Sequence, residues 1–280
     1  MKILITGSGG LLGRFASTVA AARHEVLALS RADLDVTDRA AVDHAVGRFL
    51  PQAVLHCAAY TDVDGAERHS GLAMEVNAVG AEWVAKAARD AGAAMVFVST
   101  DYVFDGERRT PYEETAPTCP RSSYGRSKLE GERRVAEACP DGWLTVRTGW
   151  VYGPSKGFVD WAKKRLVASK ELPLVDDQTG SPTYALDLAE ALLALVEGEH
   201  RGLFHFVNRG ETTWVTLVRF LASELGVKEP QVKTISGEAL GRPAPRPAYS
   251  AMSVEKFEDA TGIQVRAWQD ALKRYLANSR

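Results

Sequence analysis

The sequence has little cysteine and no recognisable metal-binding motif. Its three cysteines, Cys57, Cys119 and Cys139, form no CxxC pair and no even-numbered set that would predict a disulfide framework. The six histidines form no HExxH motif and no cluster with cysteine, so we expect no metal site. This cysteine usage is typical of a reducing compartment and predicts a cytoplasmic location.

Long apolar runs and a surplus of one charge are also absent. The longest apolar run, residues 91–98, is far shorter than the ~20 residues of a membrane-spanning helix. The apolar start of the chain gives way to glycine too early for a signal peptide. The 34 Lys and Arg residues oppose 36 Asp and Glu residues, which argues against nucleic acid or an anionic membrane as a partner. A site for a small molecule is therefore favoured.

Short apolar segments alternate with helical periodicity over the first 150 residues. Strands are expected over residues 2–6, 25–29, 53–57, 94–99 and 144–147, and helices over residues 11–23, 39–49, 71–91 and 124–138. Continuous apolar strands separated by helices predict an α/β fold with a doubly wound, Rossmann-type parallel sheet covered on both faces.

The periodicity becomes less regular after Trp150. Helices are expected over residues 158–168, 184–196, 213–225 and 267–276, and short strands over residues 172–175, 203–207 and 232–235. The strand over residues 203–207 is apolar enough to join the main sheet. We therefore expect one domain from residues 1–150 plus about 182–207, and a smaller α/β substrate-binding lid from about 151–181 plus 208–280.

A glycine-rich segment, Thr-Gly-Ser-Gly-Gly-Leu-Leu-Gly over residues 6–13, separates the first strand from the first helix. Glycines at this place allow a tight turn, close approach of the backbone to a pyrophosphate and close packing of helix on sheet. The helix N-terminus then presents free N–H groups to the phosphates. A plain strand-to-helix turn is the alternative, but the context favours dinucleotide binding in the first domain.

The residues after the second strand bear on the choice of nicotinamide cofactor. A carboxylate at this place would bind the ribose 2′-hydroxyl of NAD, but this chain has Ser30 and Arg31. A hydroxyl and a guanidinium suit a 2′-phosphate, so NADPH is favoured and NADH is possible. Arg31 could also be a solvated surface residue. Asp35, followed by Val36, could bind the adenine amino group or cap the next turn.

Tyr124 and Lys128 lie four residues apart and therefore share one face of the predicted helix. A free tyrosine has a pKa near ~10, and an adjacent cation would favour the phenolate. An ordinary amphipathic helix also produces this spacing. However, an earlier strand ends in Thr100 and Asp101, at the edge of a parallel sheet where ligands bind. Thr100 could orient a substrate hydroxyl or carbonyl there.

These motifs resemble those of the extended short-chain dehydrogenase/reductases, and further stretches narrow the resemblance to the dTDP-4-dehydrorhamnose reductases. The stretches are Ala-Ala-Tyr-Thr-Asp-Val-Asp (58–64), Ser-Thr-Asp-Tyr-Val-Phe-Asp-Gly (99–106), Arg-Thr-Gly-Trp-Val-Tyr-Gly (147–153), Asp-Gln-Thr-Gly-Ser-Pro-Thr (177–183) and Arg-Pro-Ala-Tyr-Ser (246–250). They occur in family order over nearly the whole chain.

The resemblance implies an NADPH-dependent oxidoreductase that reduces the C4 ketone of dTDP-4-dehydro-L-rhamnose to give dTDP-L-rhamnose. Tyr124 would deliver the proton, and Lys128 would bind the nicotinamide-side ribose and lower the pKa of Tyr124. The expected cofactor contacts are Gly7, Gly10, Leu11, Leu12, Gly13, Ser30, Arg31, Asp35, Val36, Ala58, Ala59, Tyr60, Tyr124 and Lys128.

The resemblance also implies contacts to the nucleotide-sugar substrate. Thr100 and Asp101 would touch the sugar near its reacting carbon, and Trp150 would offer it an apolar face, although a core tryptophan is the other interpretation. Arg246, in a proline-rich loop, could bind the diphosphate of the substrate or only stiffen the lid.

Some residues depart from related patterns. Tyr102 stands where nucleotide-sugar dehydratases carry a catalytic glutamate, so a dehydratase is not expected. His56 and Met252 replace a common asparagine and leucine, and neither change removes chemistry. Asp270 is the one acid of the closing helix, so the Mg²⁺ site through which some members dimerise is not expected. A monomer and a homodimer both remain open.

The amino-acid sequence is also compatible with two other functions. The chain could be a non-catalytic, NADP-binding regulatory subunit of a methionine adenosyltransferase, or a reductase or epimerase of another nucleotide-linked hexose. The presence of Thr100, Tyr124 and Lys128 together favours an enzyme.

Overall fold

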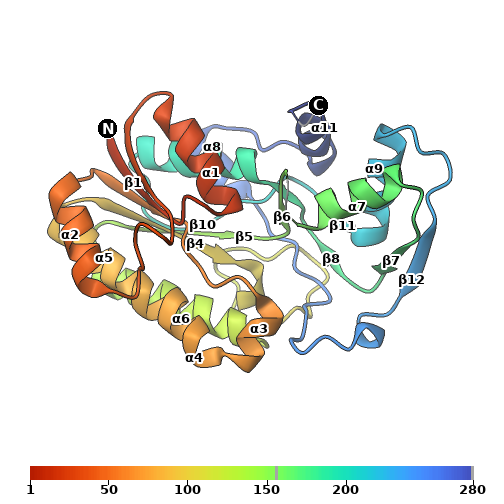
Figure 1. Cartoon of the computed structure of the whole chain (residues 1–280), viewed down its shortest axis with the longest axis horizontal. Helices are drawn as coiled ribbons and strands as arrows, with labels where there is room; N and C mark the ends of the chain where they lie inside the picture. Colours follow the sequence, from red (N-terminus) through yellow and green to blue (C-terminus); the bar gives the residue numbers. More distant parts are fainter. Residues whose placement is uncertain (155–156, 279–280) are drawn as a thin grey trace.

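Six parallel strands form the central sheet in a computed structural model that describes residues 1–154 and 157–278 (Figure 1). Their order across the sheet is β10 (Gly202–His205), β5 (Trp143–Thr148), β4 (Ala94–Thr100), β3 (Ala53–His56), β1 (Lys2–Thr6) and β2 (Glu25–Leu29). The chain passes to opposite sides of β1 to form β2 and β3. The loops that follow the carboxyl ends of β1 and β3 therefore run in opposite directions, and a crevice for a ligand lies between them. The predicted doubly wound α/β fold is confirmed.

Alternate side chains of β1 enter two separate apolar layers. Ile3 and Ile5 pack against α1 (Leu11–Ala21) and α8 (Ala185–Glu197), whereas Leu4 packs on the opposite face. That second face is covered by α2 (Arg39–Phe49), α5 (Ala81–Asp90) and α6 (Ser123–Ala138). Because both faces are covered, the strands are continuously apolar, as the sequence pattern indicates.

The region predicted as one helix over residues 71–91 is divided. α4 (Ser70–Met74) is followed by a π-helical segment, Glu75–Gly80, and then by α5. A π-helical turn rotates the side chains that follow it and commonly occurs at functional sites. Apolar periodicity does not reveal it, and the prediction of a single α-helix is wrong here. A short helix, α3 (Val63–Arg68), also precedes it unpredicted.

A second apolar core lies beyond β5. It is built on α7 (Phe158–Val167), α9 (Trp214–Glu224) and α11 (Trp268–Asn278). Three two-stranded pairs accompany these helices: β7 (Leu172–Val175) with β12 (Val232–Ile235), β8 (Thr179–Gly180) with β11 (Thr212–Thr213), and β6 (Val151–Tyr152) with β9 (Thr183–Tyr184). α10 (Glu255–Thr261) precedes α11 and packs on the main sheet. Four residues of the expected lid, 155–156 and 279–280, lie outside the described residues.

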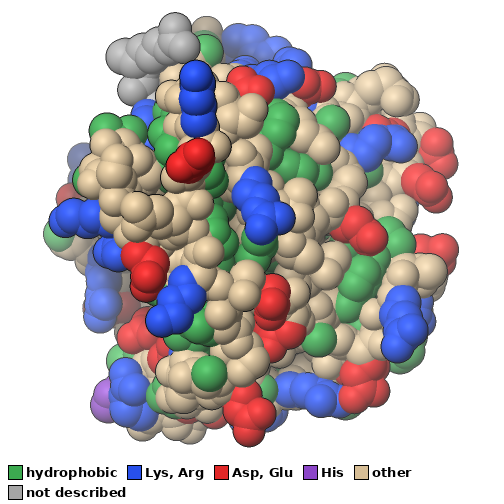
Figure 2. Space-filling view, turned by 90° about the vertical axis from the view of Figure 1, so that its right-hand side faces the viewer, with side chains coloured by type: hydrophobic (Ala, Val, Ile, Leu, Met, Phe, Trp, Pro, Cys, Tyr) green, Lys and Arg blue, Asp and Glu red, His purple; other side chains and the backbone are tan. Residues whose placement is uncertain are grey.

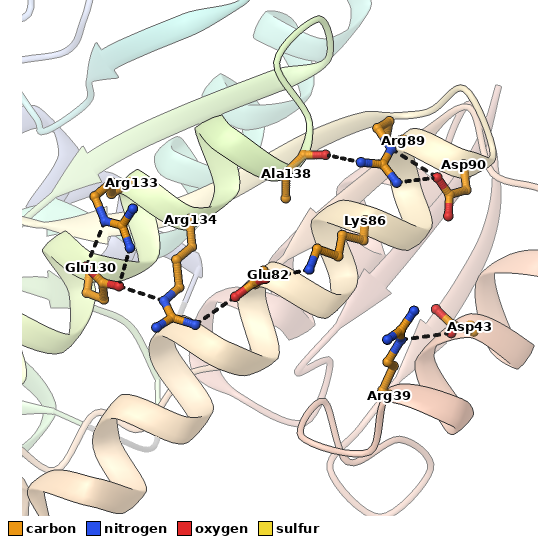
Figure 3. Close-up of polar contacts among 10 residues, drawn as sticks. All are labelled: Arg39, Asp43, Glu82, Lys86, Arg89, Asp90, Glu130, Arg133, Arg134 and Ala138. Atoms are coloured by element: carbon orange, nitrogen blue, oxygen red, sulfur yellow. Dashed lines mark hydrogen bonds and ion pairs between the residues drawn. The ribbon is translucent and has the colours of Figure 1, made fainter.

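The outer surface of α5 and α6 carries a network of ion pairs (Figure 3). Arg134 lies between Glu130, on its own helix, and Glu82 of α5, with N–O distances of 2.6 and 2.7 Å. Lys86 binds the other carboxylate oxygen of Glu82 at 2.6 Å. Pairs of this kind are partly solvated and contribute little each. The network therefore aligns the two helices, while the apolar layer beneath supplies most of the stability.

The face of the molecule shown in Figure 2 carries charges of both signs. On this face, Lys and Arg side chains are interspersed with Asp and Glu and form no continuous patch of one sign. Within residues 1–154 and 157–278, every helix is too short or too polar to cross a membrane.

Candidate active site

A cavity of about 910 Å³ opens at the carboxyl ends of the central strands. Every site residue predicted from the sequence lines it, except Arg246: Gly7, Gly10, Leu11, Leu12, Gly13, Ser30, Arg31, Asp35, Val36, Ala58, Ala59, Tyr60, Thr100, Asp101, Tyr124, Lys128 and Trp150. The described residues hold no group of three or more His, Cys, Asp or Glu side chains arranged for a metal ion.

The glycine turn forms one end of this cavity. Gly7 has φ of +69°, a conformation that favours glycine, and its carbonyl accepts a hydrogen bond of 2.9 Å from the N–H of Gly10. A Cβ at Gly13 would lie 2.2 Å from the same carbonyl, so only glycine fits there. No side chain caps the start of α1. The first N–H groups of this helix therefore remain available to an anion, and the diphosphate of a dinucleotide fits this end.

Two carboxylates, Asp33 and Asp35, follow the end of β2. Asp33 accepts hydrogen bonds from the N–H and hydroxyl of Ser30, at 2.9 and 2.5 Å. Asp35 accepts from the N–H and hydroxyl of Thr37, at 3.0 and 2.7 Å, and so caps the turn before α2. These bonds lower the pKa of both carboxyl groups. Arg31 is exposed at the rim and supplies the cation at this end.

The start of α6 places Tyr124 in the cavity. Ser122 caps the helix by accepting a hydrogen bond of 3.0 Å from the N–H of Gly125, so Tyr124 lies in the first turn. Gly125 is required because a Cβ would lie 2.2 Å from the carbonyl of Tyr102. The Tyr102 ring packs edge-on against the Tyr124 ring, with 5.6 Å between centroids. The phenol is therefore held by packing on its helix and on the segment after β4.

Thr100 stands at the end of β4. Its hydroxyl donates to Asp101 Oδ1 at 2.9 Å and accepts from the Tyr102 N–H at 3.2 Å, and it lines the same cavity as Tyr124. Burial raises the pKa of Tyr124 to about 12, against a smaller lowering by the Thr100 side chain. Lys128 is not among the groups that shift this pKa, and its ammonium lies over the Phe97 ring. The lowering by Lys128 that the resemblance implies stays a prediction.

Lys128 lies at the floor of the cavity and is 2% exposed. Its Nζ lies 3.9 Å from the centre of the Phe97 ring, and no residue in the described part of the chain accepts a hydrogen bond from it. Burial lowers the pKa of Lys128 to about 7. Its donors are therefore free for a ligand hydroxyl.

Two buried oxygen atoms at the cavity have no hydrogen-bond partner among the described residues. They are Oδ2 of Asp101 and Oγ1 of Thr148. Burial raises the pKa of Asp101 to about 6, so its carboxyl group changes charge close to neutral pH.

Trp150 separates this cavity from a second one of about 530 Å³, because it lines both. Its backbone has φ of +47°, and its indole stacks on Trp214 with 3.5 Å between centroids and 5° between planes. Arg246 lines only the second cavity. Two of its N–H groups donate to the carboxylate of Asp64 in α3, at 2.5 and 2.7 Å. This pair joins the proline-rich loop to the first part of the chain.

Asn77 is a positioning residue that the sequence analysis missed. It is fully buried in the π-helical segment. Its Oδ1 accepts from the Tyr60 N–H at 2.8 Å, and its Nδ2 donates to the Tyr60 carbonyl at 3.1 Å and to Ser127 Oγ at 2.9 Å. Asn77 thus ties the segment after β3 to α6. Only the presence of an amide within an apolar helical pattern could have indicated it.

Known proteins are similar to this chain over nearly its whole length. The chain is 42% identical to the dTDP-4-dehydrorhamnose reductase of Mycobacterium tuberculosis, covering 99% of this chain and 92% of that protein. It is 37% identical to the dTDP-4-keto-6-deoxy-D-glucose reductase of Streptomyces niveus, covering 96% and 94%. A dTDP-4-dehydrorhamnose reductase from Bacillus anthracis, solved in complex with NADP, has a TM-score of 0.95 at 33% identity and covers 99% of both chains.

The family described as RmlD substrate binding domain matches residues 1–280. This match and the full-length relatives confirm the resemblance that the motifs predict. The chain belongs to the RmlD substrate binding domain family.

Proposed function

We propose that the chain reduces the C4 ketone of dTDP-4-dehydro-L-rhamnose with NADPH to give dTDP-L-rhamnose, and that Tyr124 donates the proton. The observation that carries this proposal is that Thr100, Tyr124 and Lys128 line one cavity together with the glycine turn. Residues 1–150 with about 182–207 would bind the cofactor, and about 151–181 with 208–280 would cover the substrate.

The residues at the cavity fit a dinucleotide phosphate. The open N-terminus of α1 suits the diphosphate, and Arg31 suits a 2′-phosphate. The free ammonium of Lys128 suits the hydroxyls of the nicotinamide-side ribose. When bound, NADPH supplies the hydride for the ketone carbon.

The side chains of the chain itself supply the proton and hold the sugar. A phenol with a pKa near 12 stays protonated at neutral pH, so Tyr124 is ready to give its proton to the ketone oxygen as negative charge develops there. Thr100 lines the cavity with the phenol. Asp101 and Thr148 line the same cavity and would lie beside the sugar.

The test of this function is turnover of a panel of nucleotide-linked sugars, followed by the loss of NADPH absorbance. The panel contains dTDP-4-dehydro-L-rhamnose, its D-gluco counterpart dTDP-4-keto-6-deoxy-D-glucose, and the corresponding UDP sugars. We expect the highest kcat/KM for dTDP-4-dehydro-L-rhamnose. A preference for the D-gluco ketone would assign another hexose, and failure of every ketone with both nicotinamide cofactors would favour the regulatory-subunit alternative.

The preference for NADPH should depend on Arg31. Arg31→Ala is expected to raise the KM for NADPH about tenfold and that for NADH less than about twofold, because only the 2′-phosphate loses a charged hydrogen-bond donor. Steady-state kinetics with each cofactor measure the two effects. Arg48→Ala, at the exposed end of α2 and away from the cavity, is the control. Equal changes for both cofactors would contradict the assignment.

The two roles considered for Arg246 predict different kinetics. If Arg246 binds the diphosphate of the substrate, Arg246→Ala should raise the KM for the sugar nucleotide about tenfold. Asp64→Ala would then have a much smaller effect, because it frees the guanidinium without removing it. If the pair only stiffens the loop, both variants should raise this KM equally. We expect the first result, since Arg246 lines the second cavity beside Trp150.

A further inference from the structure

The Lys128 ammonium is buried on the face of an aromatic ring. Its Nζ lies 3.9 Å from the centre of the Phe97 ring, and both side chains are within the interior, at 2% and 0% exposure. No carboxylate in the described part of the chain lies within ion-pair distance of it. Removing a cation from water is costly unless another group compensates. The negative face of the ring provides that compensation by a cation–π interaction.

The Phe97 ring is held in place from two sides. It lies on β4 in register with His56 of β3, and the two rings are nearly parallel at 17° with 6.0 Å between centroids. His56 Nδ1 is in turn 2.8 Å from Thr6 Oγ1. On the helix side, a Cβ at Gly131 would lie 2.7 Å from Cζ of Phe97. The ring therefore has one position available, with its face directed at Lys128.

The titratable groups around Lys128 offer its ammonium little stabilisation besides the contact with the Phe97 ring. Four titratable groups face it from the elements packed on it: Tyr124 and Glu132 of α6, His56 of β3 and Cys57 after β3. Three of them are neutral at neutral pH, because burial raises the pKa of Tyr124 and of Cys57 to about 12 and lowers that of His56 to about 3. Glu132 alone carries charge, and its carboxylate is bound to Arg147.

We propose that Phe97 is a positioning residue for Lys128, whose ring face favours the charged form of the buried amine and holds it at the cavity before any ligand binds. The part of Lys128 in the reaction rests on the proposed function. The contact itself, and its effect on the proton affinity of Lys128, do not. Replacing the ring by an aliphatic side chain would remove the attraction for the cation and leave the burial unchanged.

The direct test is the pKa of Lys128 in the cofactor-free protein, measured by NMR with ¹³C-labelled lysine side chains and assigned with Lys128→Met. Phe97→Leu is expected to lower this pKa by about one unit. Phe257→Leu is the matched control, because Phe257 is fully buried and packs on Phe206. It should destabilise the protein similarly and leave the pKa of Lys128 unchanged.

A nearly isosteric change keeps the test decisive if Phe97→Leu fails to fold. Incorporating 3,5-difluorophenylalanine at position 97 weakens the negative ring face and should lower the Lys128 pKa by a smaller amount. In kinetics, the alkaline limb of kcat/KM should move to lower pH with the pKa, whereas Phe257→Leu should not move it. An unchanged pKa in both Phe97 variants would overturn the proposal. A protein without any turnover would reject the proposed function and leave the NMR result standing.

Discussion

Tyr124→Phe is expected to lower kcat about 10³-fold while leaving the affinity for NADPH within about twofold. The change removes one oxygen atom from the cavity and almost no volume. Its pKa of about 12 keeps the hydroxyl protonated, so in the proposed reaction it is the acid beside the developing alkoxide. Steady-state kinetics with the sugar nucleotide and a fluorescence titration with NADPH separate the two effects.

Tyr112→Phe is the control for this prediction. The Tyr112 hydroxyl is also buried in hydrogen bonds, to Asp105 and to three backbone N–H groups, but it lies outside the cavity. Its loss should reduce stability and leave kcat nearly unchanged. Full activity in Tyr124→Phe would show that another group donates the proton.

The largest effect on stability is expected from Glu132→Ala, which should lower the free energy of unfolding by about 3–5 kcal/mol. The Glu132 carboxylate accepts hydrogen bonds from Arg147 Nε and Nη2 at 2.9 and 2.7 Å, and from Ser99 Oγ at 2.5 Å. The two charged side chains are only 10% and 5% exposed. Alanine leaves the guanidinium of Arg147 without a counter-charge between α6 and the sheet. Chemical denaturation measures the loss, and Tm should fall by roughly 10 °C.

An exposed pair on the same helix provides the control. Arg133 binds Glu137 at 2.5 Å, with both side chains more than half exposed, so Glu137→Ala should cost less than about 0.5 kcal/mol. The double replacement of Glu132 and Arg147 by methionine should recover most of the stability, because it removes the unpaired charge. A loss below about 1 kcal/mol for Glu132→Ala would mean that this buried pair is not a structural requirement.

The elements of the central sheet could be predicted because their patterns are local. The strand over residues 2–6 has a continuous apolar centre at residues 3–5, and the helix over residues 39–49 has an acceptor, Asp38, at its start and Pro51 after its end. The π-helical segment and α3 could not be predicted in this way. Asn77 is buried in the first because it binds the backbone of Tyr60, a contact made by tertiary structure. Short pairs such as β8 with β11 likewise depend on distant partners.

Motifs at strand ends also located most of the candidate site, because the loops after parallel strands converge. The sequence could not predict which partners these residues contact. Spacing placed Lys128 near Tyr124, but its ammonium lies on Phe97, which belongs to another strand. Arg246 binds Asp64, which is 182 residues away. The rise in the pKa of Asp101 depends on its burial, which a sequence does not express.

The central claim is that this cavity brings the nicotinamide of NADPH and the C4 ketone of a dTDP-linked 6-deoxyhexose together. It is tested most directly with NADPH deuterated at nicotinamide C4, supplied separately in its two prochiral forms together with dTDP-4-dehydro-L-rhamnose. The product is then examined by NMR. We expect one form to place deuterium on C4 of the rhamnosyl product and the other to place none. Product without deuterium at C4 from either form, or deuterium at another carbon, would contradict the claim.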